Sequence, residues 1–322
     1  SIGTHPIYKE IGMCPEYPVR IISKYKMQGI CKFCGNSTIL RKSHIIPSFV
    51  YKWQKETSGT GHIRYGEEPD KRVQDGFKPY YFCDDCEGEF NKWETPFNKE
   101  NFRPLNEGKD GGNQYSDYLL KFAVSVSWRV LTFIINELNI SHLPEKQVQE
   151  AYVALDIWKK FLINEISHPG KHQQHMLVYD MIMDYSNIGT LPPNINRYLL
   201  RSIDMDVVGN EDYAYVYTKM GKFVLVGFIE YPQPRHWVGT QIHVKKGILI
   251  KRKYTLPIEF WEHIQYRARR LLAVDSKTSL RQRKKIDEDY RKKKDIALSS
   301  ETVKATQQDI NLFGKDKVFR KK

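Results

Sequence analysis

The sequence predicts an α+β protein in which a small cysteine-bounded module precedes a mixed helical and β-hairpin domain and a charged C-terminal extension. Three observations lead to this prediction. Two Cys-x-x-Cys pairs lie in the first third of the chain. Apolar residues then recur at three- and four-residue steps, interrupted by short β-branched and aromatic runs. After Ser276, charged residues dominate and apolar residues become too sparse to form a core.

Length and composition favour a soluble protein of at least two domains. The chain has 322 residues, of which 40% are hydrophobic and 13% aromatic, and domains usually hold about 100–200 residues. No apolar run approaches the roughly 18 residues of a membrane span, and the N-terminus lacks a secretory signal pattern. We therefore expect a cytoplasmic protein with no membrane partner.

The charge balance favours a polyanionic partner. The formal net charge is +13, and the isoelectric point lies near 9.3. Such a field attracts nucleic acid, although an anionic membrane surface also fits this charge.

Four of the five cysteines form the two Cys-x-x-Cys pairs, which are Cys31/Cys34 and Cys83/Cys86. In a reducing compartment, pairs with this spacing are typical of metal ligands rather than disulfides. Four thiolates complete a tetrahedral zinc site, and structural zinc contributes on the order of 10 kcal/mol to folding. We therefore expect structural Zn²⁺ bound by these four residues.

The cysteines bound a module that we place at residues 31–105, after an N-terminal lead-in at residues 1–30. The polar, Gly-rich segment Tyr51–Gly76 predicts loops or a hairpin inserted between its two halves. A strand is expected at Phe77–Phe82. The second pair then enters a helix, with Asp84 as N-cap and Glu87 as its capping-box partner.

Polar residues that suit phosphodiester chemistry flank the predicted zinc site. On the helix after Cys86, residues Glu87, Asn91 and Glu94 fall at i, i+4 and i+7, and therefore on a single face. His44 lies in an apolar stretch ten residues after Cys34, where a strand would place it on the same face as Ile46. Zinc that joins these two segments would let His44 face Asn91.

The segment from Cys31 to Asn98 resembles the HNH, or ββα-metal, endonuclease family, in its subset with two zinc-binding Cys-x-x-Cys pairs. The family pattern Asp-His-Ile-x-Pro is matched by the stretch Ser43–Pro47. This resemblance implies that His44 is the general base that activates water, and that Asn91 is a ligand of a catalytic Mg²⁺ or Mn²⁺. Glu94 and Glu87 are the carboxylates that we expect to assist there, Glu94 in catalysis and Glu87 at the metal.

Two positions depart from the family pattern. Ser43 stands where a metal-binding Asp or His is common, and a hydroxyl is a weaker ligand for a hard cation. The family's middle Asn, which orients the histidine, has no counterpart between His44 and Cys83. We expect Gln74 or Asp75 to take one of these roles.

The second domain is placed at residues 114–275, after the turn cluster Asn106–Asn113. The sequence does not identify its role, and recognition, sensing and oligomerisation are the alternatives. We expect helices and hairpins in the following order: helices at Tyr118–Leu138 and Val148–Ile163, hairpins at Ala214–Ile229 and Ile242–Ile250, and a helix at Ile258–Val274. The last helix carries Arg267, Arg269 and Arg270 on its polar side. The extension at residues 276–322 is expected to be a solvated helix or a flexible tail.

Taken with the resemblance, these features predict a metal-dependent endonuclease that hydrolyses nucleic-acid phosphodiesters, with DNA favoured over RNA. Four basic residues of the module are candidates for contacts to flanking phosphates: Arg41, Lys42, Arg64 and Arg72. By family analogy, the setting is phage defence or restriction, with a homo-oligomer or an activating partner protein. The alternative is a non-catalytic, zinc-dependent nucleic-acid-binding or regulatory protein.

Overall fold

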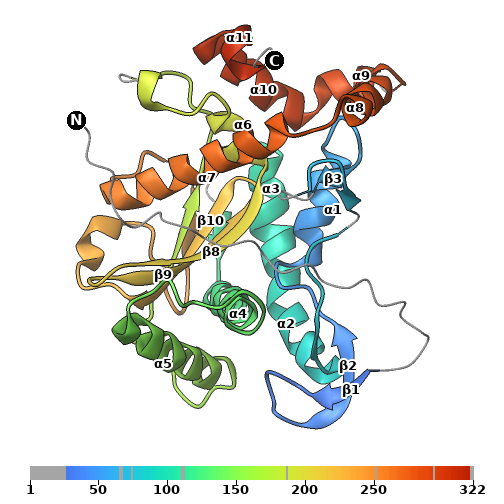
Figure 1. The fold of residues 1–322 in the computed structure, drawn as a ribbon. Helices are drawn as coiled ribbons and strands as arrows, with labels where there is room; N and C mark the ends of the chain where they lie inside the picture. The colour runs from blue at the N-terminus through green and yellow to red at the C-terminus, as the bar shows by residue number, and fades with distance from the viewer. Residues whose placement is uncertain are drawn as a thin grey trace.

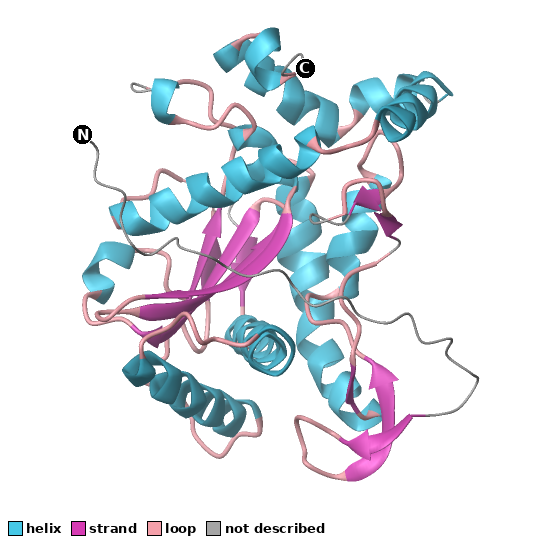
Figure 2. Ribbon diagram, viewed as in Figure 1, coloured by secondary structure: helices cyan, strands magenta, loops and turns pink. Residues whose placement is uncertain are grey.

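A computed structural model of the chain describes residues 27–64, 68–73, 75–109, 113–185, 188–250, 252–292 and 294–319. In these ranges a four-stranded antiparallel sheet lies between helices, and a smaller sheet with its own helix lies beside it (Figure 1). Helices and strands are mixed along the chain, with helices predominating (Figure 2). The predicted α+β class is confirmed. Most of the predicted lead-in, residues 1–26, lies outside the described residues.

The smaller sheet and helix α2 carry the cysteines. Strands β1 (Met27–Ile30) and β2 (Ser37–Lys42) pair antiparallel, and β2 pairs antiparallel with β5 (Tyr80–Phe82). Helix α1 (Ser48–Glu56) and a short hairpin of β3 (Ile63–Arg64) and β4 (Arg72–Val73) are inserted between β2 and β5. Helix α2 (Asp84–Pro96) follows β5 and continues through the π-helical turn η2 (Phe97–Phe102) into α3 (Arg103–Asn106).

The larger sheet is an antiparallel array in the order β7, β10, β9, β8. Its strands are β7 (Gln174–Val178), β8 (Ile203–Gly209), β9 (Ala214–Met220) and β10 (Phe223–Glu230). Figure 1 shows α4 (Tyr118–Phe133) and α5 (Glu145–Leu162) on one face and α7 (Ile258–Ser276) on the other. Because both faces are covered, every residue of β9 is buried.

Shorter elements complete this part of the molecule. They are the π-helical turn η3 (Ile134–Leu138), helix α6 (Ile195–Arg201), the 3-10 turns η4 (Ile188–Thr190) and η5 (Pro234–Trp237), and the antiparallel strand pair β6 (Asn113–Tyr115) and β11 (Gly247–Leu249).

Within residues 276–292 and 294–319, the C-terminal extension contains the helices α8 (Leu280–Lys292), α9 (Lys294–Ser299), α10 (Glu301–Phe313) and α11 (Lys315–Val318). Helix α10 packs on α6, because the buried carboxylate of Asp309 accepts hydrogen bonds from the backbone N–H groups of Asn196, at 2.8 Å, and Arg197, at 3.2 Å. The extension is therefore docked at α10 rather than fully solvated.

One hydrophobic core joins the cysteine-bearing part to the larger sheet. The ring of Phe97 stacks on Phe122 of α4 at a centroid distance of 4.0 Å, and Phe102 stacks on Phe223 of β10 at 5.4 Å. Phe33, in the first cysteine turn, meets Trp128 of α4 edge-on. The two predicted domains therefore share packed aromatic side chains rather than a linker.

Helix α4 together with η3 is long and apolar enough to cross a membrane by length and composition, although no segment of this kind was expected from the sequence. However, 89% of its most apolar 18-residue stretch is buried inside the protein. A core helix of a globular protein passes the same composition test. Here the apolar residues pack against α2, α5 and the larger sheet.

Several predicted elements are correct and others are not. The hairpin β9–β10 and the helices α4, α5 and α7 lie where the sequence predicted them. The predicted hairpin at Ile242–Ile250 is wrong, because β11 pairs with the distant β6. Arg267 is also not on a solvent-facing side: its guanidinium binds Asp204 and Asp206 of β8 beneath α7. In both cases the structure depends on residues that are distant in the sequence, namely β6 for β11 and β8 for Arg267.

Candidate metal centre and histidine site

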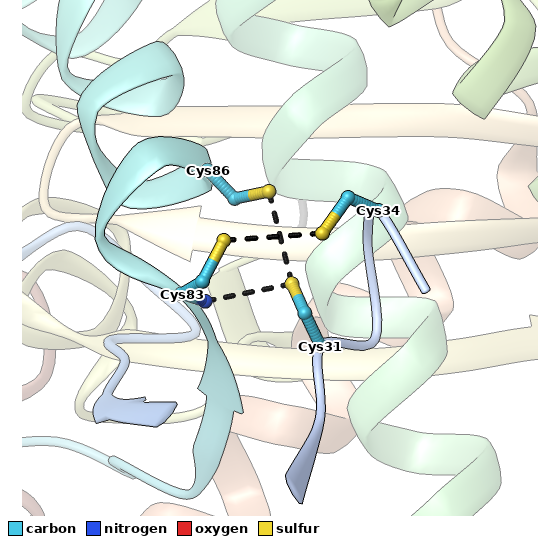
Figure 3. A group of neighbouring side chains, drawn as sticks. All are labelled: Cys31, Cys34, Cys83 and Cys86. Atoms are coloured by element: carbon cyan, nitrogen blue, oxygen red, sulfur yellow. Dashed lines mark hydrogen bonds between the residues drawn. The ribbon is translucent and has the colours of Figure 1, made fainter. Parts of the chain in front are cut away.

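The four cysteines of the two pairs converge at one point (Figure 3). Cys31 Sγ lies 3.7 Å from Cys86 Sγ, and Cys34 Sγ lies 3.9 Å from Cys83 Sγ. A zinc ion bound to four thiolates at about 2.3 Å places neighbouring sulfurs roughly 3.8 Å apart. The cluster therefore could bind a metal ion, and its dimensions are those of a structural zinc site.

Local backbone geometry explains this convergence. Between β1 and β2 the chain makes a tight turn, in which Gly35 N–H donates to Cys31 O at 2.9 Å and Gly35 adopts a left-handed φ of 82°. The second pair lies at the start of α2, where Cys83 is the N-cap residue and Asp84 is the first helical residue. The prediction that Asp84 caps the helix is wrong, because no side chain bonds the cap position.

The environment of the cluster favours a thiolate at Cys31. Burial disfavours its ionised form, yet N–H donors from Cys34, Cys83 and Phe33 lower the pKa of Cys31 to about 7. The Cys83 donor lies 3.4 Å from the Cys31 sulfur. Hydrogen bonds to a ligating sulfur also occur in metal centres.

His44 follows the end of β2 and lies next to a carboxylate. Its Nε2 is 2.8 Å from Asp75 Oδ1, and Asp75 Oδ2 accepts a hydrogen bond from Lys78 Nζ at 2.9 Å. Burial alone would raise the pKa of Asp75, but the Lys78 and His44 contacts outweigh it and lower that pKa. Asp75, one of the two residues expected to support the histidine, is therefore in contact with it; Gln74 lies outside the described residues.

Arg129 of α4 connects His44 to helix α2. Its Nη1 donates to the backbone carbonyl of His44 at 3.1 Å, its Nη2 lies 2.7 Å from Glu94 Oε1, and its Nε donates to Ser125 O at 3.2 Å. The guanidinium also lies 5.0 Å from the Phe90 ring centroid. Arg129 was not among the site residues predicted from the sequence. The available signal was that Arg129 is the only charged residue in the stretch Val124–Phe133, because a buried arginine requires partners.

The predicted polar stripe on α2 is divided between buried and exposed positions. Burial raises the pKa of Glu94, and the attraction of Arg129 opposes this shift; the charge of Glu87 raises it further, whereas His44 lowers it. Glu87 Oε1 is buried and has no hydrogen-bond partner among the described residues. Asn91 is exposed. Thus Glu87 and Glu94 interact electrostatically, whereas Asn91 faces solvent.

Ser43 is fully buried, and its Oγ donates to Arg41 O at 3.2 Å. The hydroxyl is therefore turned toward its own strand. This agrees with its weak suitability as a metal ligand.

The predicted phosphate-contacting residues lie in different settings. Arg41 forms a two-pronged ion pair with Asp84, with both N–O distances at 2.5 Å, although both side chains are more than half exposed. Lys42 Nζ lies 5.6 Å from the ring centroid of Tyr80. Arg64 and Arg72 pair in the β3–β4 hairpin, but their side chains lie outside the part that the structure describes.

Across the described ranges, the four cysteines are the only group of three or more His, Cys, Asp or Glu ligand atoms that lie within 4.8 Å of one another. No family model, no curated protein and no solved structure matches this chain. The four-cysteine cluster and the contacts of His44 are therefore the features from which a function is inferred.

Proposed function

We propose that the protein is a metal-dependent HNH-type endonuclease that hydrolyses phosphodiesters of DNA, with His44 as the general base. The observation that supports this most directly is the contact between His44 and Asp75, in a chain that also brings four cysteines together. A carboxylate that accepts the proton of one ring nitrogen leaves the other nitrogen with a lone pair. That nitrogen is then able to take a proton from water.

In this proposal His44 accepts the proton of a water molecule as the oxygen attacks phosphorus, and the bond to the leaving oxygen breaks. Asp75 holds the imidazole in the required tautomer, and Arg129 fixes the position of the His44 backbone. A bound Mg²⁺ or Mn²⁺ would stabilise negative charge on the phosphate. Glu87 is the candidate ligand for this cation, because its buried Oε1 has no hydrogen-bond partner in the described part of the chain, and exposed Asn91 follows it by one turn on α2.

The second candidate is a non-catalytic, zinc-dependent nucleic-acid-binding or regulatory protein. The single convergent ligand group in the described ranges favours it, because a cation site at Glu87 is not already formed by three protein ligands. Both candidates use the zinc cluster as a scaffold. They differ only in whether His44 performs chemistry.

A plasmid-nicking assay with Mg²⁺ or Mn²⁺ separates the two candidates. We expect His44→Ala to lower the cleavage rate by about 10²–10⁴-fold, as for loss of a general base, and Asp75→Asn to lower it by about 10–100-fold, as for loss of an orienting partner. His236→Ala is the matched control, because His236 is exposed and lies in the 3-10 turn η5. Equal cleavage by wild type and His44→Ala, or no cleavage of any DNA or RNA substrate, would refute the nuclease proposal.

The proposal includes a cytoplasmic location and a role in restriction or phage defence. A cytoplasmic restriction or antiphage nuclease must restrain its activity until needed. A second copy of the chain or an activating protein would supply that control, and cleavage assays across protein concentrations would reveal the first of these.

A further inference from the structure

We infer that the outward face of helix α8 binds the phosphate backbone of duplex DNA and extends the substrate surface away from His44. This inference takes nucleic acid as the occupant from the proposed function, and it adds a contact surface and the double-stranded form. Its support comes from how α8 is held, from the charges on its outward face, and from its position relative to His44.

Helix α8 is fixed to the body of the protein by one face. Gln282 is buried and Arg283 is half-buried. At the start of the helix, Ser279 N–H donates to Asp70 Oδ1 at 2.8 Å. These contacts decide which side of α8 faces outward.

The outward face is strongly cationic. At 100° per residue, the positions opposite Gln282 and Arg283 carry five cations, one carboxylate and one exposed leucine, which are Arg281, Lys284, Lys285, Arg291, Lys292, Glu288 and Leu280. Arg281, Lys284 and Lys285 follow the i, i+3, i+4 spacing of a single helix face. All three are exposed, and within the described ranges none of them forms a hydrogen bond or ion pair. Free cations in such a row attract a polyanion.

The β3–β4 hairpin connects this face to the candidate site. Asp70, between β3 and β4, touches the start of α8, and Asp75, just after β4, touches His44. Figure 1 shows α8 beside this hairpin. Five residues of chain span at most about 18 Å, which is roughly five base pairs of duplex at 3.4 Å each. A duplex longer than about five base pairs that is seated at His44 is therefore long enough to extend to α8.

The side chains on this face favour a duplex over a single strand. Proteins that bind single strands without sequence preference stack successive bases on aromatic rings. The outward positions of α8 carry no aromatic residue in the described part of the helix. Lysine and arginine without a stacking platform contact phosphates.

The test measures binding of a duplex of about 20 base pairs to the full chain carrying His44→Ala. Binding is measured by fluorescence anisotropy at several salt concentrations. The triple variant Arg281→Gln/Lys284→Gln/Lys285→Gln should make the negative slope of log K against log salt shallower by about 2.7, because about three phosphate contacts are lost. Three purely electrostatic contacts correspond to weakening by up to about 500-fold at 0.1 M salt. Circular dichroism should show an unchanged helix content.

The matched control removes three other exposed lysines, in Lys245→Gln/Lys246→Gln/Lys253→Gln. These residues precede α7, whereas α8 follows it, and 19 helical residues span about 28 Å. The control should leave the salt slope unchanged. Equal effects of both triple variants, or an unchanged slope in the α8 variant, overturn the inference.

The inference also fails if the α8 triple variant loses binding to single-stranded RNA or to an acidic protein but still binds the duplex as tightly as wild type does. A protein that binds duplex through α8 but never cleaves refutes the nuclease proposal and supports the surface. If the wild-type protein cleaves DNA but the α8 triple variant has the wild-type salt slope, the nuclease proposal is supported and the α8 surface is refuted.

Discussion

The buried guanidinium of Arg129 should determine the stability of the region around His44. Arg129 is 2% exposed and Glu94 13% exposed at their side chains, and they form an ion pair at 2.7 Å. Replacement by methionine in Arg129→Met preserves much of the packing on Phe90 but leaves Glu94 buried without its partner. Breaking a buried pair from one side is expected to lower the free energy of unfolding by about 3–5 kcal/mol.

The pH dependence of this effect has a definite sign. Burial already raises the pKa of Glu94 above its ordinary value, while Arg129 opposes that rise. A carboxyl group whose pKa is raised on folding stabilises the protein below its unfolded pKa, and this contribution is lost as pH rises through the folded pKa. Without Arg129 the pKa of Glu94 rises further. The destabilisation in Arg129→Met should therefore be larger at neutral pH than in acid.

Urea denaturation of wild type, Arg129→Met, Glu94→Gln and the double variant tests this at about pH 5 and pH 8. The double variant should be more stable at pH 8 than Arg129→Met by about 1 kcal/mol or more, because no unpaired charge remains. Arg281→Met is the surface control and should change stability by less than about 0.5 kcal/mol. A change of under about 1 kcal/mol in Arg129→Met at pH 8, or strict additivity of the two single variants, would refute the reasoning.

Three further predictions concern the scaffold. Removing one cluster ligand in Cys83→Ser should abolish tight zinc binding and unfold the module, since structural zinc contributes about 10 kcal/mol; metal analysis that still finds one zinc per chain would contradict this. Burial alone would raise the pKa of Asp204, but Arg267 outweighs it and holds that pKa below its usual value. This stabilisation is present above the unfolded pKa and is lost as pH falls. Arg267→Leu should therefore destabilise the protein by about 3–5 kcal/mol near pH 7 and move its acid unfolding midpoint, measured by circular dichroism, to higher pH; an unchanged midpoint would argue against it. Phe97→Ala should lower stability by about 3–5 kcal/mol in one cooperative transition, because Phe97 stacks on Phe122 across the two predicted domains. Two separate calorimetric transitions would show that the shared core does not couple them.

Features set by short-range interactions were predictable from the sequence. The Cys-x-x-Cys spacing fixes the direction of two sulfurs within a single turn, and each pair is formed by local backbone geometry. The β9–β10 hairpin likewise depends on a two-residue turn, in which Gly221 adopts a φ of 61° between Met220 and Phe223. In both cases the residues that decide the structure are neighbours in the chain.

Features that depend on distant partners were not predictable in the same way. The segment Ile248–Leu249 has strand character, but whether it pairs with its neighbour or with Asn113–Gln114 is decided by tertiary packing. Arg267 looks like a solvent-facing helix residue, since its partners Asp204 and Asp206 lie about 60 residues earlier in the chain. Periodicity identifies which residues share a helix face and says little about what covers that face.

The position of Arg129 bears on the role of the second domain. This residue belongs to α4, which packs against the larger sheet, yet two of its nitrogens contact His44 and Glu94 in the cysteine-bearing part. Close-packed aromatic rings join the same two regions at Phe97 and Phe122. A shift of α4 relative to α2 would therefore displace the His44 backbone or separate the buried ion pair. This arrangement favours a second domain that supports the candidate site directly over one that only recognises a partner elsewhere on its surface.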